Sequence, residues 1–285
     1  MIDKILVLTL ERCVDRQYAW LGASQMRDIP LERVRFVKGQ DDKDYDSMAA
    51  IVKAAENNGF PFVEEFAIGT VTDYVQQTPG SVCQVWNYGR ILRHISERSE
   101  VCLVIHDDKM VNVSFNIINI IINELLSREA EEFYVCQLAQ RGDINEIALD
   151  QDKDRFEIDR ISTAVFQAIF NHAIVSYEDF FLKKGIAGYD ETMVLSPAGA
   201  AWILNFLYNS DDFYIFYDHF IHCRLTTAAA IANQNGKGVY CPALSGYDFV
   251  RQIMPMATTT HFAPEGTVHF EQAQLNTDVV WENVK

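Results

Sequence analysis

The stretch Val101-Cys102-Leu103-Val104-Ile105-His106-Asp107-Asp108 decides the fold class that the sequence predicts. Its first five residues are apolar, as in a short strand that is buried on both faces of a parallel sheet. The apolar run ends at one histidine and two aspartates, which are common ligands of divalent cations. Open α/β sheets bind their ligands at the carboxyl ends of the strands. The stretch therefore predicts a metal and phosphate site, and an ordinary acidic turn is the alternative.

Strand-like and helix-like stretches alternate along the rest of the chain. Apolar runs predict strands at 4–10, 34–37, 133–138, 192–195 and 239–244. Helical spacing and capping residues predict helices that end near Met26 and that cover 47–56, 81–95, 114–128, 197–208 and 218–232. Ser81 and Gln84 fit a capping box for the third of these helices. The alternation favours an α/β fold with a mainly parallel central sheet flanked by helices.

The composition limits the class of protein. We expect a single domain over residues 1–285, less regular from about residue 250, because no linker or repeat divides the chain. The formal charge of −16 argues against a broad surface for nucleic acid or anionic membranes, although a local basic pocket is compatible with it. Six cysteines without a C-x-x-C pair predict a reduced, cytoplasmic protein. Asparagines interrupt the most apolar helical stretch, 115–126, so we expect no transmembrane segment.

Several short motifs occur in an order typical of one enzyme family. They are Thr9-Leu10-Glu11-Arg12-Cys13-Val14-Asp15-Arg16, Phe36-Val37-Lys38-Gly39, Pro79 to Asn87, Ile105-His106-Asp107-Asp108 and Ser196-Pro197-Ala198-Gly199-Ala200. In this order the chain resembles the glycosyltransferases of family 25, which include the lipooligosaccharide and collagen galactosyltransferases. The resemblance covers roughly residues 4 to 245. It implies a nucleotide-diphospho-sugar transferase fold of the GT-A-like type.

The resemblance also implies a donor site with a metal. Asp108 is the first expected ligand of Mn²⁺ or Mg²⁺, and His106 is the second. The donor is then a UDP-sugar, with galactose or glucose as the hexose. Its nucleotide is expected near the ends of three strands, at Thr9, Glu11, Arg16, Asp41 and Asp107. Two alternatives remain open: a salt bridge from Arg16 to Asp15 or Glu11, and a solvated acidic loop at Asp41 and Asp42.

Transfer to an acceptor hydroxyl needs a group that removes its proton. Asp218 is the expected base and Asp190 the reserve, with a helix N-cap as the alternative role of Asp218. The acceptor is a glycan, a lipid-linked sugar or a protein, and the sequence does not choose among them.

Two other functions compete with this interpretation. Departures from the family motifs at Thr9, His106 and Asn87 suggest a non-catalytic nucleotide-sugar or glycan binder on the same scaffold. A metal-dependent phosphohydrolase is the second, and it would use His94, His106, Asp107 and the pair Asp218-His219.

Overall fold

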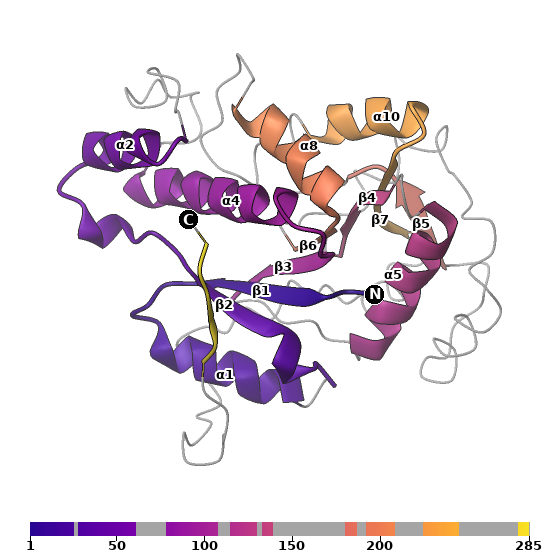
Figure 1. Cartoon of the computed structure of the whole chain (residues 1–285), viewed down its shortest axis with the longest axis horizontal. Helices are drawn as coiled ribbons and strands as arrows, with labels where there is room; N and C mark the ends of the chain where they lie inside the picture. The colour runs from indigo at the N-terminus through magenta and orange to yellow at the C-terminus, as the bar shows by residue number, and fades with distance from the viewer. Residues whose placement is uncertain are drawn as a thin grey trace.

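A computed structural model describes residues 1–25, 28–60, 78–107, 115–129, 133–138, 180–186, 192–208, 225–244 and 279–284. The strands in this part of the chain are β1 (Lys4–Thr9), β2 (Val34–Lys38), β3 (Cys102–His106), β4 (Phe133–Gln137), β5 (Phe180–Lys184), β6 (Met193–Leu195), β7 (Gly238–Leu244) and β8 (Trp281–Glu282). The α-helices are α1 (Val14–Gln25), α2 (Met48–Asn57), α4 (Pro79–Ser96), α5 (Phe115–Glu129), α8 (Pro197–Tyr208) and α10 (Thr226–Gln234). Short 3-10 helices cover Leu31–Arg33 (η1) and Asp42–Asp44 (η2). The α/β class is confirmed (Figure 1).

All these strands form one sheet, in the order β5-β7-β4-β6-β3-β1-β2-β8. Strands β1, β2, β3 and β8 pair in parallel, and so do β4 and β7. Strand β6, however, runs antiparallel to both β3 and β4, and β5 runs antiparallel to β7. The predicted mainly parallel sheet is therefore wrong, and the sheet is mixed. The prediction assumed a crossover to a parallel neighbour after each helix, and a three-residue strand such as β6 carries no sequence mark of its direction.

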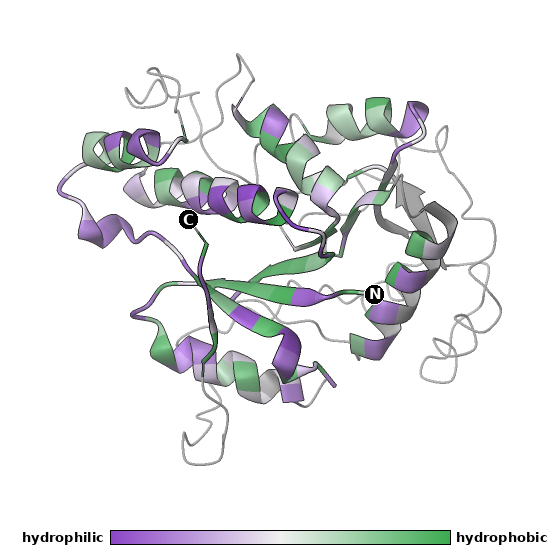
Figure 2. Cartoon of the chain, viewed as in Figure 1, coloured by the Kyte–Doolittle hydropathy of each residue, from purple (hydrophilic) through white to green (hydrophobic). Residues whose placement is uncertain are grey.

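Alternate side chains of the central strands enter two separate cores. Ile5 and Val7 of β1 pack with α1 and α5 on one face of the sheet, while Leu6 and Leu8 pack with α2, α4, α8 and α10 on the other. The same alternation divides β3, in which Leu103 and Cys102 belong to different cores. Figure 2 shows these two strands as a hydrophobic centre, with hydrophilic residues on the flanking helices. Helices on both faces explain the continuous apolar run of β3.

Most predicted elements are confirmed to within a few residues, but the predicted cap of α4 is not. The helix begins at Pro79, and its cap is Thr78, whose hydroxyl accepts from the backbone nitrogen of Ser81 at 3.2 Å. Ser81 reciprocates by accepting from the backbone nitrogen of Thr78 at 3.1 Å. The capping box is therefore Thr78 with Ser81, and the predicted Ser81–Gln84 box is wrong. Proline at the first helical position is the signal that fixes this start.

The last described segment adds an unpredicted strand. Residues 281 and 282 pair in parallel with Phe36 and Val37 of β2, and Val284 is buried in the core beside α4. The predicted irregular tail is thus wrong for residues 279–284, while 245–278 lie outside the described residues. No helix within the described ranges is long and apolar enough to cross a membrane. Four cysteines have side chains that the structure describes, and all four carry free thiols: Cys13, Cys83, Cys102 and Cys136.

Candidate functional site

The sheet has a switch point beside its first strand. Strand β2 lies on one side of β1 and β3 on the other, so the chain leaves β1 in one direction and later returns on the opposite side. The helices of these two connections cover opposite faces, α1 on one and α2 with α4 on the other. Such a reversal opens a crevice at the carboxyl ends of the strands, where doubly wound folds bind their ligands.

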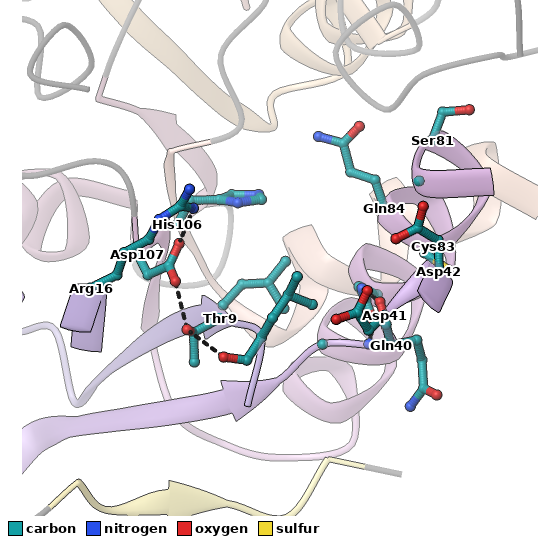
Figure 3. Close-up of a pocket in the computed structure, with 15 residues that line it drawn as sticks. Thr9, Arg16, Gln40, Asp41, Asp42, Ser81, Cys83, Gln84, His106 and Asp107 are labelled. Atoms are coloured by element: carbon teal, nitrogen blue, oxygen red, sulfur yellow. Dashed lines mark hydrogen bonds and ion pairs between the residues drawn. The ribbon is translucent and has the colours of Figure 1, made fainter. Parts of the chain in front are cut away.

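A pocket of about 290 Å³ occupies this position (Figure 3). Its walls come from the ends of β1, β2 and β3 and from the first turns of α4. The lining residues are Leu8, Thr9, Leu10, Arg16, Gly39, Gln40, Asp41, Asp42, Gly80, Ser81, Cys83, Gln84, Asn87, His106 and Asp107. Of the predicted site residues, the structure therefore brings Thr9, Arg16, Asp41, His106 and Asp107 together around one cavity.

One wall is organised around the carboxylate of Asp107. The hydroxyl of Thr9 donates to Asp107 Oδ2 at 2.6 Å, and the Arg16 guanidinium lies 3.6 Å from Oδ1. Gln17, almost fully buried, donates to the Thr9 hydroxyl oxygen at 3.4 Å and to the Leu10 carbonyl at 3.0 Å. The expected Arg16 salt bridge to Asp15 or Glu11 is not the one observed. Arg16 instead stands at the pocket with its cation beside Asp107.

The second wall contains two aspartates after β2. Asp41 is buried, forms an ion pair with Arg12 and accepts from the backbone nitrogen of Lys43 at 3.1 Å. The hydrogen bond from Arg12, more than any other contact, holds the pKa of Asp41 below its ordinary value. The alternative of a solvated loop is therefore wrong for Asp41. The Asp42 carboxylate faces the start of α4, since a Cβ added to Gly80 would lie 3.8 Å from it.

An asparagine of α4 fixes the turn between these two walls. The Asn87 side chain accepts from the Gln40 backbone nitrogen at 2.7 Å and donates to the Gln40 carbonyl at 3.2 Å. The backbone of Gly39 donates to the Thr9 carbonyl at 2.7 Å. A side chain at Gly39 has little space, because its Cβ would lie 3.1 Å from the Asn87 side-chain nitrogen and 3.2 Å from the Thr9 carbonyl oxygen. Asn87 thus holds the backbone of Gln40 in place at the wall of the pocket.

The described residues do not test the metal prediction fully, because they contain His106 and Asp107 but not Asp108. His106 lines the pocket and its ring lies 5.5 Å from the ring of Tyr88, centroid to centroid. Asp107, the neighbouring carboxylate, is already engaged by Thr9 and Arg16. No group of three or more potential metal ligands gathers within the described ranges. These residues alone do not complete a metal site, and Asp108, the first expected ligand, lies outside them.

The other predicted residues either lie away from the pocket or fall outside the described residues. Glu11 is exposed and pairs with Lys38, and it does not line the pocket. The expected bases, Asp190 and Asp218, lie outside the described residues. His94, which the phosphohydrolase alternative requires, contacts Glu282 at 3.2 Å, and Glu282 pairs in turn with Lys4 at the start of β1. The structure therefore does not bring His94 together with His106.

Sequence reasoning missed Gln17, Gln40 and Asn87. Gln17 sits one helical turn into α1 and Asn87 on the buried face of α4, both at positions where a polar residue interrupts an apolar environment. A buried amide needs hydrogen-bond partners, and this requirement is the signal that was available.

We also compared the chain with known proteins: no protein-family model matches it, and no curated protein matches it.

Proposed function

We propose that the chain is a glycosyltransferase with a GT-A-like fold, which takes a hexose, galactose or glucose, from a UDP-sugar and transfers it to an acceptor hydroxyl. The observation that carries the proposal is the position of the pocket. It lies at the carboxyl ends of β1 and β3, beside the switch point of the sheet, where α/β folds bind nucleotides. Four of the five family motifs contribute residues to this pocket, and the fifth, Ser196 to Ala200, does not.

The polarity of the pocket suits a nucleoside diphosphate. Arg16 provides a planar cation that can hold phosphate oxygens with two nitrogens. The first turn of α4 adds the positive end of a helix dipole at Gly80 and Ser81. On the β2 side, Gln40 and Asp41 offer acceptors for the hydroxyl groups of a ribose or hexose. A cation at the pocket is notable in a chain with a formal charge of −16.

The proposed reaction exchanges one bond for another at the anomeric carbon. The acceptor oxygen bonds to that carbon, the bond to the diphosphate oxygen breaks, and UDP leaves. Asp218, with Asp190 in reserve, takes the acceptor proton in this proposal. Asp108 and His106 are the proposed ligands of Mn²⁺ or Mg²⁺, which would offset the charge on the departing diphosphate. The acceptor class stays open among a glycan, a lipid-linked sugar and a protein.

Calorimetric titration of the full chain with UDP, UDP-glucose and UDP-galactose tests donor binding. We expect binding by the parent chain, and about 10- to 100-fold weaker binding by Arg16→Gln, because a hydrogen bond to a charged group contributes about 1.5–3 kcal/mol. Arg35→Gln is the matched control, since Arg35 bonds the backbone carbonyls of Glu32 and Val34, neither of which lines the pocket. Absence of binding to any nucleotide sugar, or equal binding by Arg16→Gln and its control, contradicts the proposal.

Two further arms separate the parts of the proposal. Repeating the titration with and without Mn²⁺, on the parent and on Asp108→Ala, tests the metal, and an unchanged Mn²⁺ response in Asp108→Ala removes that assignment. Measuring UDP release with glycan acceptors tests catalysis. Donor binding without any UDP release or transfer would support the non-catalytic binder instead. Phosphate release from simple esters without donor hydrolysis would support the phosphohydrolase.

A further inference from the structure

Arg90 of α4 connects three parts of the molecule that are distant in sequence. One guanidinium nitrogen donates to the Lys38 carbonyl at 3.0 Å and lies 3.4 Å from the Asn87 side-chain oxygen. The other donates to the carbonyl of Val284. These partners are oxygens without a formal charge, and burial lowers the pKa of Arg90. The partly buried Arg90 cation thus hydrogen-bonds the backbone carbonyls of Lys38 and Val284.

Of the first two oxygens, that of Asn87 belongs to a residue that lines the pocket, and that of Lys38 directly precedes the pocket wall in sequence. Lys38 is the last residue of β2 and precedes the Gly39–Asp42 turn, whose residues line the cavity. Asn87 clamps that turn through both backbone groups of Gln40. Arg90 therefore contacts both Asn87 and the end of β2, from which the Gly39–Asp42 turn continues.

The third oxygen, the Val284 carbonyl, belongs to the segment 279–284, which also makes contacts that do not involve Arg90. The carbonyl of Val280 accepts from the Phe36 backbone nitrogen at 2.8 Å, strand β8 pairs with β2, and the Val284 side chain is buried. Figure 1 places this end of the chain next to α4. Two anchored points, β2 and the 279–284 segment, thus hold the guanidinium through its two terminal nitrogens.

We infer that Arg90 is a positioning residue, which uses the docked 279–284 segment to hold the Gly39–Asp42 turn in the shape that the pocket ligand requires. The inference deepens the proposed function, and its ligand readout rests on that function. Loss of either anchor lets the guanidinium turn away, so that Asn87 alone restrains Gln40. Removal of Arg90 and removal of the segment then damage the same element.

Arg93 provides a matched control on the same helix. Its two guanidinium nitrogens also donate to two backbone carbonyls, at Asn58 and Gly59, and its charge lies over the Phe60 ring. Neither carbonyl belongs to the pocket wall. Arg93→Met therefore removes a similar set of contacts without touching the turn.

The test compares Arg90→Met, Arg93→Met and deletion of residues 279–284 in UDP titrations and thermal melts. We expect about tenfold weaker UDP binding for Arg90→Met and for the deletion, and unchanged binding for Arg93→Met at a comparable loss of Tm. Combining Arg90→Met with the deletion should weaken binding no further than either change alone, because both act through one element. Arg90→Lys, which keeps one donor, should recover part of the affinity.

Amide hydrogen exchange of the ligand-free protein gives a readout that does not depend on the proposed function. The Gly39 and Gln40 amides donate to Thr9 and Asn87, so they are protected in the parent. We expect faster exchange over residues 38–42 in Arg90→Met and in the deletion, and parental exchange in Arg93→Met. Unchanged exchange at this turn in both altered proteins overturns the inference. Failure of UDP binding in the parent, with the exchange pattern intact, would instead count against the proposed function alone. If Arg90→Met does not fold, the deletion, which retains Arg90, carries the same expectation.

Discussion

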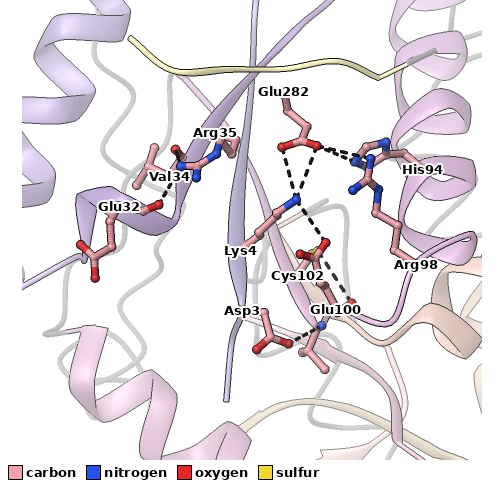
Figure 4. Close-up of polar contacts among 11 residues, drawn as sticks. Asp3, Lys4, Glu32, Val34, Arg35, His94, Arg98, Glu100, Cys102 and Glu282 are labelled. Atoms are coloured by element: carbon pink, nitrogen blue, oxygen red, sulfur yellow. Dashed lines mark hydrogen bonds and ion pairs between the residues drawn. The ribbon is translucent and has the colours of Figure 1, made fainter. Parts of the chain in front are cut away.

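Asp107 and Glu282 are largely buried carboxylates beside basic side chains, and they contact opposite ends of β1, at Thr9 and at Lys4. Asp107 follows β3 at the carboxyl end, with the Thr9 hydroxyl at 2.6 Å and Arg16 at 3.6 Å. Glu282 reaches the amino end of β1, with Lys4 at 3.4 Å, His94 at 3.2 Å and Arg98 at 3.6 Å (Figure 4). The residue types are alike, and the surroundings are not.

The difference lies in what each group faces. Around Glu282 the charged side chains pair with one another, because Lys4 also pairs with Glu100 at 3.2 Å, and Glu282 itself belongs to the strand that pairs with β2. Asp107 and Arg16 face a cavity of about 290 Å³ with a single long contact between them. Breaking a closed set of buried ion pairs destabilises the fold, whereas a charged side chain that lines a cavity can also contact a ligand. Substitutions at or beside the two carboxylates separate these roles.

The largest expected effect on stability is at Glu282. Glu282→Gln leaves the ammonium of Lys4, largely buried at 18% side-chain exposure, without one of its two carboxylates. We expect a loss of about 2 kcal/mol in the free energy of unfolding, below the about 3–5 kcal/mol for a fully buried pair. Urea denaturation measures it. Glu11→Gln is the control, because the exposed Glu11–Lys38 pair should contribute less than about 1 kcal/mol. Equal losses in the two variants would erase the distinction drawn above.

The stretch 101–108 shows how far sequence could predict the fold. Five consecutive apolar residues have to be buried on both faces, and this requirement identified the central strand and the α/β class. The direction of β6 could not be predicted. The strand has only three residues, all apolar, and the same residues would suit a parallel or an antiparallel position between β3 and β4. Strand β8 was missed because it has only two residues, which are placed by pairing with β2 and by the ion pair of Glu282 with Lys4.

The candidate site was predictable where it depends on strand ends. Thr9, Asp41, His106 and Asp107 each end or follow a strand, and parallel neighbours bring such positions to one edge. The partners of these residues were not predictable. The Thr9–Asp107 hydrogen bond spans 98 positions of sequence and exists because β1 and β3 are neighbours. Asn87 appeared only as a departure from a family motif, and its contacts give it a physical role that the motif did not suggest.

A smaller effect is expected at the pocket end of the comparison. Thr9→Val keeps the shape of a buried side chain and removes the hydroxyl that donates to Asp107. We expect a loss of about 1 kcal/mol in unfolding free energy, below the about 1.5–3 kcal/mol for a hydrogen bond to a charged group, because the pocket admits water to Asp107. Thr9→Ser, which keeps the donor, is the control for the lost hydroxyl. A loss for Thr9→Val as large as that for Glu282→Gln would mean that the pocket end is a stabilising ion cluster as well.

The smallest effect concerns pH and belongs to the Glu282 end. Burial, the main cause, lowers the pKa of His94, and the positive Arg98 and Lys4 act in the same direction while Glu282 and Glu100 oppose it. In the unfolded chain His94 regains its ordinary pKa of about 6.5, so the unfolded state binds the proton first as the pH falls. The stability that neutral His94 provides is therefore complete above about pH 6.5 and is lost as the pH falls through its folded-state pKa.

Denaturation midpoints between about pH 7.5 and pH 5.5 measure this contribution as the difference between the parent and His94→Gln, which cancels the other histidines. We expect the parent to lose more stability than His94→Gln over this range. The pocket end should contribute nothing to that difference, because the lowered pKa of Asp41 confines its own loss to more acidic solutions, below its ordinary value of about 3.9. A parent that gains stability relative to His94→Gln on acidification would show instead that protonated His94 strengthens the Glu282 cluster, and that this end of the sheet is held by charge more than by burial.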